Sequence, residues 1–536
     1  MKKQSLICIL SIILTAGIFA LEVDKNELQS AESTTIEFIN YTGPHKVIDS
    51  AASIKGIGSN LGKTIAQDVE KASSSGAANR YKVIHAVDPN ETGKLDADIL
   101  YIGSDATVDH IDNLRRIIAG YLSAAYSYSD EDANTLAVFI TVYNAVYRGN
   151  LDAYKNKYKN EVQKNLSADN CGLSVNYKDW PGKSEIVIPL YDVANGGLST
   201  VDTSVISDSK VIDSMKEDDD RNVESRKEMV DIKEREADNA SEKAQEAQKE
   251  AVVEQKKANE AKKEATEAKK EAEEARKEAE EKQKVADENP EDQKAQEEAA
   301  AAKEEAEEKE EVAQQKEEAA QEAQESAEQA KEEAKEQQAQ ADKKQSEAQE
   351  ERKEIAQDQK EVQKEEAEKA QMPTEYGIIL ADEAEMLSRL VKFNKDNGEI
   401  IQNSPVSVIR NRTIYKGSEA YFAIAGENSK NGAIKFVSID PDTMEITGET
   451  DLAVTQDSVL VQDGADYLCV VEENGMNYLA KFGEDLSLKA KSEIQVKSAT
   501  PITVTDAGFV VTDSNGKLKL LDKTDLSDLS KTNDAK

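Results

Sequence analysis

Few residues of this 536-residue chain have the types and spacing that catalysis requires. The histidines are His45, His85 and His110, and none lies at the spacing of a metal site or near a candidate nucleophile. Carboxylates are abundant, but nothing in the sequence selects a pair of them for acid–base chemistry. We therefore expect no catalytic residues, no metal site and no cofactor, and we interpret the chain as a protein that is not an enzyme.

One glycine-rich stretch, residues 56–64, has features of a phosphate-binding segment. It ends in Gly62-Lys63-Thr64, as a phosphate-binding loop does, but position 57, where such a loop needs glycine, holds Ile57. The stretch is closer to the hairpin of helix-hairpin-helix modules, whose backbone amides grip a nucleic-acid phosphate. The interpretation we favour is structural, namely a tight glycine turn that joins two short helices for packing.

The first residues, 1–20, have the pattern of a secretory signal: Lys2 and Lys3, an apolar core over 6–14, and small residues that end at Ala20. We expect cleavage before Leu21. No later apolar run approaches the length of about 20 residues that spans a bilayer. The mature chain is therefore expected to be exported to the periplasm or cell envelope, without a transmembrane span.

Two cysteines remain after this cleavage, Cys171 and Cys469. They lie in different parts of the chain, so they form no disulfide framework and no zinc site. They could pair only if the segment between them folds back. Two unpaired thiols are the favoured interpretation.

The elements that must position any site are organised around residues 221–371, which consist almost entirely of Ala, Glu, Lys and Gln. Apolar residues recur there every seven positions in two series: Ala244, Ala251, Ala258, Ala265, Ala272, Ala279 and Ala286, followed by Ala299, Ala306, Ala313, Ala320, Ala327, Ala334, Ala341, Ala348, Ile355 and Val362. This pattern is typical of a coiled coil whose seam is made of alanine.

The two series differ in phase across Asn289-Pro290. Asn289 suits an N-cap and Pro290 the first helical position, so a second helix is expected to begin there. We predict an antiparallel hairpin in which small side chains let the two helices approach closely. The alternative is one charged rod with a kink, stabilised by alanine propensity and by pairs four residues apart such as Glu278 and Lys282.

The chain carries 68 basic and 107 acidic side chains, a formal charge of −39. Such a surface repels nucleic acid and anionic lipid. Much of the excess lies in the helical stretch, where solvation of a long exposed helix explains it.

Residues 21–205 are predicted to form one α+β domain. Apolar side chains share a face in each of two helical segments: Ile111, Leu114, Ile117, Ile118, Tyr121 and Leu122, and then Leu136, Phe139, Ile140, Tyr143 and Val146. Residues 35–41 alternate as a strand does, short apolar runs follow at 81–87 and 99–102, and 185–190 is expected to be a strand. Residues 206–372 then form the coiled coil with its break at Asn289-Pro290.

Residues 373–536 are predicted to be rich in β-structure. Segments 419–424, 465–470 and 507–511 resemble one another, and each precedes a second strand and an Asp-rich turn. Hairpins that recur every 40 to 45 residues or so fit propeller blades, which favours a small or incomplete propeller. A plain antiparallel sandwich or meander is the alternative.

Five segments of the amino-terminal part occur in a distinctive order: 37–44 (EFINYTGP), 56–58 (GIG), 113–122 (NLRRIIAGYL), 143–152 (YNAVYRGNLD) and 180–183 (WPGK). In these segments and in its general layout the chain resembles the spirochaete 83/100-kDa antigen family of the Borrelia and Treponema type. The resemblance implies an exported cell-envelope antigen with no established enzyme activity. The alanine-rich centre departs from the family, so nothing residue-specific carries over there.

Three functions stay open from the sequence. The first is a structural or interaction protein of the envelope whose helical spacer joins two globular domains, with a protein or envelope component as partner and possible self-association through the coiled coil. The second is ligand binding or hydrolysis in the β-rich end. The third, nucleic-acid binding through 56–62, fits poorly with the acidic charge, and we expect no nucleic-acid partner.

Overall fold

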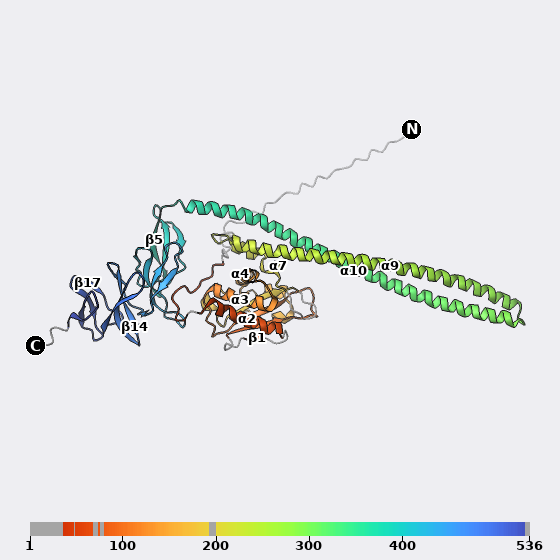
Figure 1. Cartoon of the computed structure of the whole chain (residues 1–536), viewed down its shortest axis with the longest axis horizontal. Coiled ribbons are helices and arrows are strands. Elements are labelled where there is room, and N and C mark those ends of the chain that lie inside the picture. The colour runs from red at the N-terminus through yellow and green to blue at the C-terminus, as the bar shows by residue number, and fades with distance from the viewer. Residues whose placement is uncertain (1–35, 48, 68–72, 75–79, 192–199, 531–536) are drawn as a thin grey trace, which may run out of the picture.

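The computed structural model describes residues 36–47, 49–67, 73–74, 80–191 and 200–530. The predicted signal segment, 1–20, lies outside them. A long helical hairpin projects from one side of an amino-terminal domain, and the carboxyl-terminal sheets lie on the opposite side of that domain (Figure 1). Within the described part of the chain, no helix is both long and apolar enough to cross a bilayer.

The amino-terminal domain is built on an antiparallel sheet of β1 (Ser73–Ser74), β2 (Tyr81–Ala86), β3 (Asp96–Ile102) and β4 (Ser184–Leu190), in that order. Every residue of β4 is buried. Helices accompany the sheet: α2 (Ala51–Gln67), α3 (Ile111–Tyr126), α4 (Asp130–Val146), α5 (Leu151–Lys157), α6 (Asn160–Gln163), η1 (Tyr177–Asp179), α7 (Thr203–Ile206) and α8 (Ser209–Met215). The prediction of a mixed domain of helices and strands is confirmed.

The two predicted amphipathic helices correspond to α3 and α4, and each begins at a side-chain cap. His110 Nδ1 accepts a hydrogen bond from the Asp112 amide at the start of α3, and Ser129 Oγ accepts one from the Asp132 amide at the start of α4. Their apolar faces join the domain core, which also includes the buried Trp180.

The coiled-coil stretch forms an antiparallel hairpin of α9 (Val223–Glu288) and α10 (Gln293–Lys369), as predicted. The predicted start of the second helix is wrong by a few residues. Asn289 is the C-cap of α9, and Asp292 is the N-cap of α10, with its Oδ1 accepting hydrogen bonds from the Lys294 and Ala295 amides. Pro290 therefore lies in the turn. A carboxylate outside the helix caps it as well as asparagine would, and it also complements the positive helix end.

The alanine seam lies between the two helices. Most members of both seven-residue series are buried, whereas Ala251, Ala320 and Val362 are only partly so. Near the tip Ala279 packs with Ala302 and Ala306. Ion pairs cross the helix pair beside the seam: Glu264 with Lys316, Lys269 with Glu317, and Glu271 with Lys309. Methyl burial is small per residue, so the long repeat and these exposed pairs act together.

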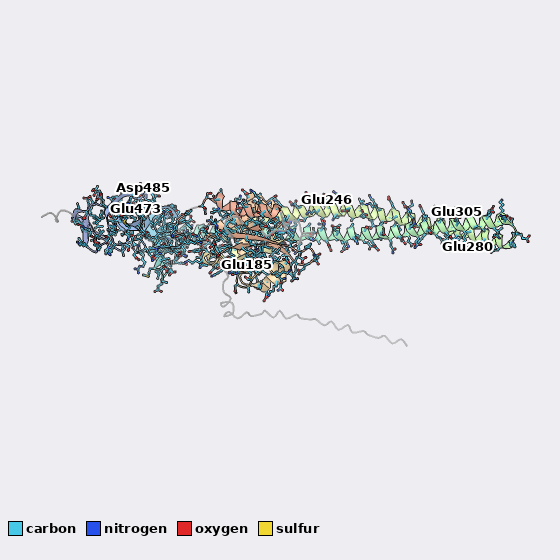
Figure 2. All side chains as sticks on the ribbon, turned by 90° about the horizontal axis from the view of Figure 1, so that it is seen from below. Glu185, Glu246, Glu280, Glu305, Glu473 and Asp485 are labelled. Atoms are coloured by element: carbon cyan, nitrogen blue, oxygen red, sulfur yellow. The ribbon has the colours of Figure 1, made fainter. Side chains whose placement is uncertain are left out.

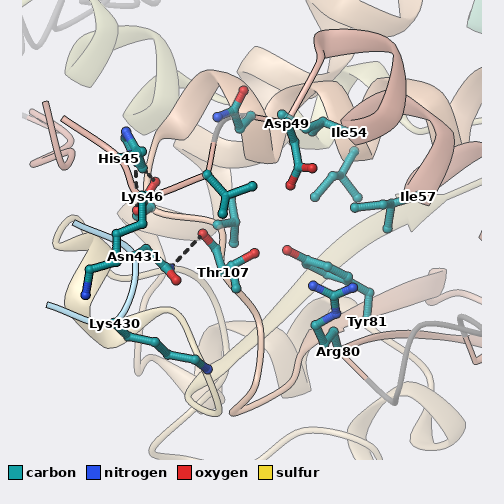
Figure 3. A pocket seen from close by; sticks show the side chains of 15 residues that line it. His45, Lys46, Asp49, Ile54, Ile57, Arg80, Tyr81, Thr107, Lys430 and Asn431 are labelled. Atoms are coloured by element: carbon teal, nitrogen blue, oxygen red, sulfur yellow. Dashed lines mark hydrogen bonds and ion pairs between the residues drawn. The ribbon is translucent and has the colours of Figure 1, made fainter. Parts of the chain in front are cut away.

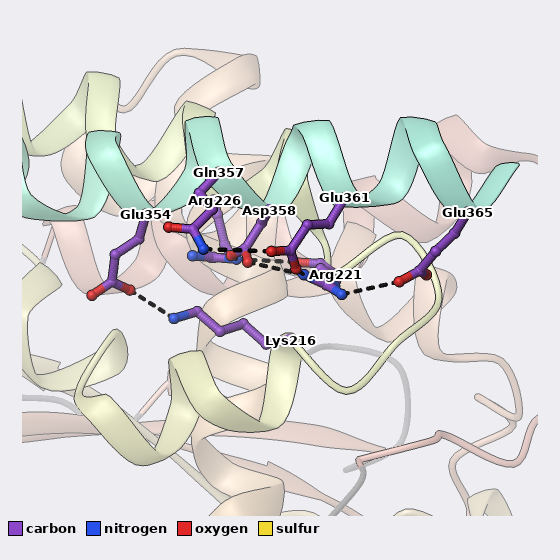
Figure 4. A network of polar contacts seen from close by, with 8 residues as sticks. All are labelled: Lys216, Arg221, Arg226, Glu354, Gln357, Asp358, Glu361 and Glu365. Carbon is purple, nitrogen blue, oxygen red and sulfur yellow. Dashed lines mark hydrogen bonds and ion pairs between the residues drawn. The ribbon is translucent and has the colours of Figure 1, made fainter. Parts of the chain in front are cut away.

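At the base of the hairpin, charged side chains tie α10 to the chain that enters α9 (Figure 4). Arg226 is fully buried, and its Nη1 donates to Asp358 Oδ2 over 2.7 Å. Lys216 Nζ lies 2.6 Å from Glu354 Oε2. Arg221 pairs with three carboxylates of α10, Asp358, Glu361 and Glu365. The base therefore adds a buried ion pair and several exposed ones to the apolar contact of Val230 with Ala348 and Ile355.

The carboxyl-terminal region consists of small antiparallel sheets that follow one another along the chain. Their strands are β5 (Thr374–Asp382), β6 (Leu387–Asn394) and β7 (Ile400–Asn403); β8 (Tyr415–Lys416), β9 (Tyr421–Ala425), β10 (Lys435–Ile439) and β11 (Ile446–Glu449); β12 (Ala453–Val454), β13 (Val461–Asp463), β14 (Asp466–Glu473), β15 (Met476–Phe482) and β16 (Leu488–Gln495); and β17 (Thr503–Thr505), β18 (Gly508–Thr512) and β19 (Leu518–Leu521).

The predicted propeller is wrong. In the described residues each apolar core joins one sheet to the next along the chain, and no core joins the first sheet to the last. The repeated hairpins that suggested blades do exist, because segments 419–424, 465–470 and 507–511 contribute to β9, β14 and β18. They form an open row of sheets (Figure 1).

Candidate functional site: the cleft between the two globular domains

Helix α2 forms one wall of a cleft between the amino-terminal domain and the carboxyl-terminal sheets. The predicted glycine turn in 56–64 is wrong, because this stretch lies inside the single helix α2. Gly58 and Gly62 face α3 instead: a Cβ at Gly58 would lie 1.8 Å from the Ile117 carbonyl oxygen, and one at Gly62 would lie 2.5 Å from that of Tyr121. The two helices therefore cross in backbone contact. The amides of 56–62 belong to a helix and form no turn around a phosphate.

The segment 41–46 crosses from the amino-terminal domain to a loop of the carboxyl-terminal region. The Lys46 amide donates to the Asn431 carbonyl over 2.7 Å, and the Ala433 amide donates to the Pro44 carbonyl over 2.8 Å. These bonds flank an antiparallel bridge between His45 and Gly432. Two segments that lie on either side of the whole hairpin in the sequence thus pair through their backbones.

Side chains surround this bridge. Thr42 Oγ1 donates to the Pro405 carbonyl over 2.7 Å, and Lys46 Nζ donates to the Ser429 carbonyl over 2.6 Å. Glu427 of the loop lies 3.5 Å from Lys178 Nζ on the amino-terminal domain. The contact therefore combines main-chain pairing, a neutral hydrogen bond from Thr42, a charged one from Lys46 and the ion pair of Lys178 with Glu427.

His45 is fixed at this contact by a carboxylate. Its Nε2 lies 3.1 Å from Asp109 Oδ1 and 3.2 Å from Oδ2, and its ring meets Tyr41 edge-on at 4.8 Å. The hydrogen bond with Asp109 raises the pKa of His45, although partial burial opposes that change. Protonation of His45 therefore strengthens its bond to Asp109 and its attraction to Glu449 on the other side of the contact.

A cavity of about 340 Å³ opens beside this contact (Figure 3). Aliphatic side chains of α2 and α3 line one part of it, including Ile54, Ile57 and Ile117. Polar and charged groups line the rest: His45, Lys46, Asp49, Arg80, Tyr81, Thr107, Asp109, Asn113, Lys430 and Asn431. Asn431 Nδ2 donates to the Thr107 carbonyl over 3.4 Å. The cavity offers apolar contact together with charged groups and hydrogen-bond donors, which suits recognition of a small amphipathic molecule.

The other two histidines, His85 and His110, have structural roles. His85 is buried in the sheet, with Nδ1 2.7 Å from Asp98 Oδ1. Asp98 Oδ2 also accepts hydrogen bonds of 2.5 Å from Tyr121 and Tyr126. Burial and the Asp98 charge raise the pKa of both tyrosines. His110 caps α3, and burial lowers its pKa.

The cysteines do not meet. Cys171 lies in the amino-terminal core and Cys469 in β14, and both are buried free thiols. Burial raises the pKa of each thiol, so neither is poised to react. The prediction of two unpaired thiols is confirmed. In the described ranges no three histidine, cysteine or carboxylate side chains are grouped to hold a metal ion. The absence of catalytic and cofactor residues stays a prediction.

Sequence reasoning missed the contact of His45 and Asp109 with 426–433. No periodicity or spacing joins these segments, which are far apart in the chain. The one local signal is Gly43-Pro44, an extended chain that ends in a tight bend, and a Cβ at Gly43 would lie 2.9 Å from Val408 Cγ2. That glycine marks a close approach to another segment without saying which one.

These features define a class of protein in which two globular domains meet at the base of a long, alanine-seamed helical hairpin. A family model described as Borrelia P83/100 protein matches residues 25–502. The chain therefore belongs to the Borrelia P83/100 protein family, which confirms the resemblance seen in the sequence. A comparison with curated proteins found no match to this chain.

Proposed function

We propose that this protein is an exported, non-enzymatic component of the cell envelope that binds another protein or an envelope component. In this proposal the hairpin is a spacer that carries its tip away from two globular domains docked together at the other end. Family membership and the signal-like residues 1–20 support export.

The observation that carries the proposal is the direction of the hairpin. The chain leaves the amino-terminal domain along α9 and returns along α10, so the carboxyl-terminal sheets begin near the domain that the chain left (Figure 1). Only the start of α9 joins the amino-terminal core, through Met229 and Ile232. From Ala244 to the tip the hairpin is therefore about 65 Å long, at 1.5 Å per residue.

Most of the exposed surface of this projecting part is polar, and its exposed apolar side chains are Val252, Val253, Val285 and Val312. Figure 2 shows Glu246 where the rod leaves the globular part, and Glu280 and Glu305 toward its far end. A rod of this kind acts as a spacer, because it presents no continuous apolar face to a partner. Val285, beside the turn, is a half-exposed apolar side chain at the tip.

Photo-cross-linking in the native cell tests this role. A photoreactive residue at position 285 probes the tip, and the same residue at position 246 is the matched control near the base. We expect the chain in the envelope fraction, with cross-links to another envelope component from 285 that are absent from 246. Retention of the chain in the cytoplasm, or equal products from both positions, would contradict the proposal.

A second candidate function is binding of a small ligand, and the cavity of Figure 3 favours it. The cavity lies at the domain contact, whereas the sequence pointed to the β-rich end alone. A ligand there would touch both domains and so stabilise their docking. A rise in the melting temperature of the whole chain with a small amphipathic acid such as octanoate, lost in Ile57→Glu, would support this function.

A further inference from the structure

The first sheet of the carboxyl-terminal region presents an unusual amount of apolar surface. Ile379 and Leu380 on β5 are 39% and 52% exposed, and Met386 and Ile400 on the same sheet are also exposed. One face of the next sheet, β8–β11, packs against this first sheet and forms the core between the two. Exposed apolar side chains gathered on one small sheet are typical of an interaction surface.

Strand β5 is also an edge. The sheet order is β5-β6-β7, so β5 pairs only with β6. It is nine residues long and contains no proline, and an irregularity after Leu380 and the charges of Glu375 and Asp382 leave Tyr376–Leu380 as its regular, uncharged part.

The hydrogen-bond pattern shows which backbone groups of β5 point outward. The Lys395 amide donates to the Pro373 carbonyl over 3.0 Å, in the same register as Thr374 with Asn394. Hydrogen-bonded and non-hydrogen-bonded pairs alternate along antiparallel strands, so Glu375, Gly377 and Ile379 bond to β6. The amides and carbonyls of Tyr376, Ile378 and Leu380 then face away from the sheet.

The far side of β6 shows the same alternation. Ser388, opposite Leu380, exchanges hydrogen bonds of 2.8 and 3.0 Å with Ile409, and the Leu390 carbonyl accepts from the Ser404 amide. On the outward side of β5, the Tyr376 amide lies 3.4 Å from the carboxylate of Glu375. For the outward groups of Ile378 and Leu380, the described residues provide no hydrogen-bond partner.

The charges on β5 itself and in the turn after it are of one sign, whereas its neighbour β6 carries Arg389 opposite Ile379 and Lys392 opposite Tyr376. Between 374 and 388 the chain carries Glu375, Asp382, Glu383 and Glu385 and no basic residue. A second copy of β5 paired antiparallel about Ile378 would bring Glu375 of each copy next to Asp382 of the other. Like charges on neighbouring strands oppose such pairing, so the edge suits a partner of opposite charge.

We propose that β5 accepts an extended segment of a partner protein as an added antiparallel strand. The segment has apolar residues at its centre, which lie beside Ile379 and Leu380, and basic residues at its ends, which face the carboxylates. Main-chain bonds to Ile378 and Leu380 provide the affinity, and the flanking charges provide the choice of partner. This surface is separate from the hairpin tip and from the cleft, so it does not depend on the proposed spacer role.

The test uses the full chain and a synthetic peptide in which valine and threonine alternate between terminal lysine pairs. Binding is followed by fluorescence anisotropy of the labelled peptide. Leu380→Pro removes an outward amide and is compared with Leu380→Ala, which keeps it. We expect the proline variant to bind at least about tenfold more weakly than the alanine variant, because it loses a main-chain bond and the strand geometry beside it.

A charge variant covers the case in which the proline variant misfolds. Glu383→Lys with Glu385→Lys leaves every β5 amide in place. This variant should bind the lysine-ended peptide more weakly than the native chain does, and it should bind the same peptide with glutamate ends more tightly. An unchanged preference would overturn the assignment of the flanking charges.

Residue-resolved amide exchange provides the sharpest readout. Without peptide, the amides of Ile378 and Leu380 should exchange fast and those of Gly377 and Ile379 slowly. With peptide, the fast amides should become protected, which restores protection along the whole strand. The proposal would be overturned if the peptide did not bind, or if it protected amides elsewhere and left those of Ile378 and Leu380 fast. It would also be overturned if light scattering showed dimers that depend on β5, which would indicate self-pairing.

Discussion

Gly58 is the position at which a single methyl group tests the packing behind the cleft. Its Cβ would lie 1.8 Å from the Ile117 carbonyl oxygen, whereas ordinary contacts begin at 3.4 Å. In Gly58→Ala, α2 must therefore move away from α3 by about 1.5 Å, a displacement that loosens the contacts of the fully buried Leu61 and Ile65. A shift of this size in a packed core costs about 1–3 kcal/mol of unfolding free energy.

Gly56 provides the matched control. It lies in the same helix, and a Cβ there would meet nothing within 4 Å. Gly56→Ala should stabilise the domain by up to about 1 kcal/mol, because alanine favours a helix over glycine. The two variants should thus differ by about 1–4 kcal/mol although they make the same chemical change.

Trp180 makes the assay specific to this domain. It is the single tryptophan of the chain, it is fully buried, and its Nε1 donates to the Ser174 carbonyl over 2.7 Å. Urea unfolding followed by its fluorescence therefore reports the amino-terminal domain alone. If Gly58→Ala were as stable as Gly56→Ala, the backbone contact of α2 with α3 would be refuted.

Three further predictions concern the domain contact and the hairpin. Asp358→Asn leaves the guanidinium of Arg226 buried without its charge partner, and should cost about 3 kcal/mol in thermal unfolding of the hairpin followed by circular dichroism; a loss within error would contradict the buried pair. Asp109 raises the pKa of His45, and the charge of Glu449 across the contact raises it further, so the docking that protonated His45 favours is complete below its undocked pKa and is lost as the pH rises through its docked pKa. Energy transfer between dyes on the two domains should fall over that range in the native chain and stay level in His45→Gln, and a fall in both would refute the assignment. Ala272→Leu overfills the seam and should lower the melting temperature of the hairpin. An unchanged melting temperature would contradict close packing at this position.

Acid should also release the base of the hairpin. Burial alone would raise the pKa of Asp358, but its hydrogen bond and charge interaction with Arg226 lower it. A carboxylate with a lowered folded pKa stabilises above its unfolded pKa, and this stabilisation is lost as the pH falls through the folded value. In the native chain the unfolding free energy of the hairpin should therefore fall with acid through the pKa of Asp358, and this part of the fall should be missing in Asp358→Asn.

The hairpin could be predicted from the sequence because its signal is local and repeated. Two alanine series, a phase shift and a turn between them leave few arrangements that bury every seam residue. The exact cap could not be predicted, because Asn289 and Asp292 are both good caps. Only the turn geometry decides that Asp292 caps α10.

The carboxyl-terminal region shows how far repeats can mislead. Each hairpin was visible in the sequence, but closure of a propeller depends on the angle between successive sheets, which no repeat encodes. The glycine stretch shows the opposite limit. A turn and a close helix crossing both require glycine, and only the position of Ile117 and Tyr121 opposite Gly58 and Gly62 distinguishes them.

The cleft was invisible in the sequence for a topological reason. Lys46 and Asn431 meet because α9 and α10 return the chain to its starting point, so the contact depends on the whole hairpin. The residues that form it are ordinary loop residues with no periodicity. The family match covers both sides of the contact, but it does not pair them.

The central claim, that the rod is a folded-back hairpin joining docked domains, is tested most directly by a matched deletion. Ala279 faces Ala306 across the seam, so residues 265–278 lie opposite 307–320. Deleting both segments removes whole heptads and keeps the register on each side. Small-angle X-ray scattering of the native and shortened chains then compares their maximum dimensions at monomeric mass.

The hairpin predicts a decrease of about 21 Å, because the two deleted segments lie side by side at 1.5 Å per residue. A single straight rod would shorten by about 42 Å, because the same segments would lie end to end. The smaller decrease would support two domains held at one end of a spacer. The larger decrease would contradict the hairpin and separate the domains that form the cleft.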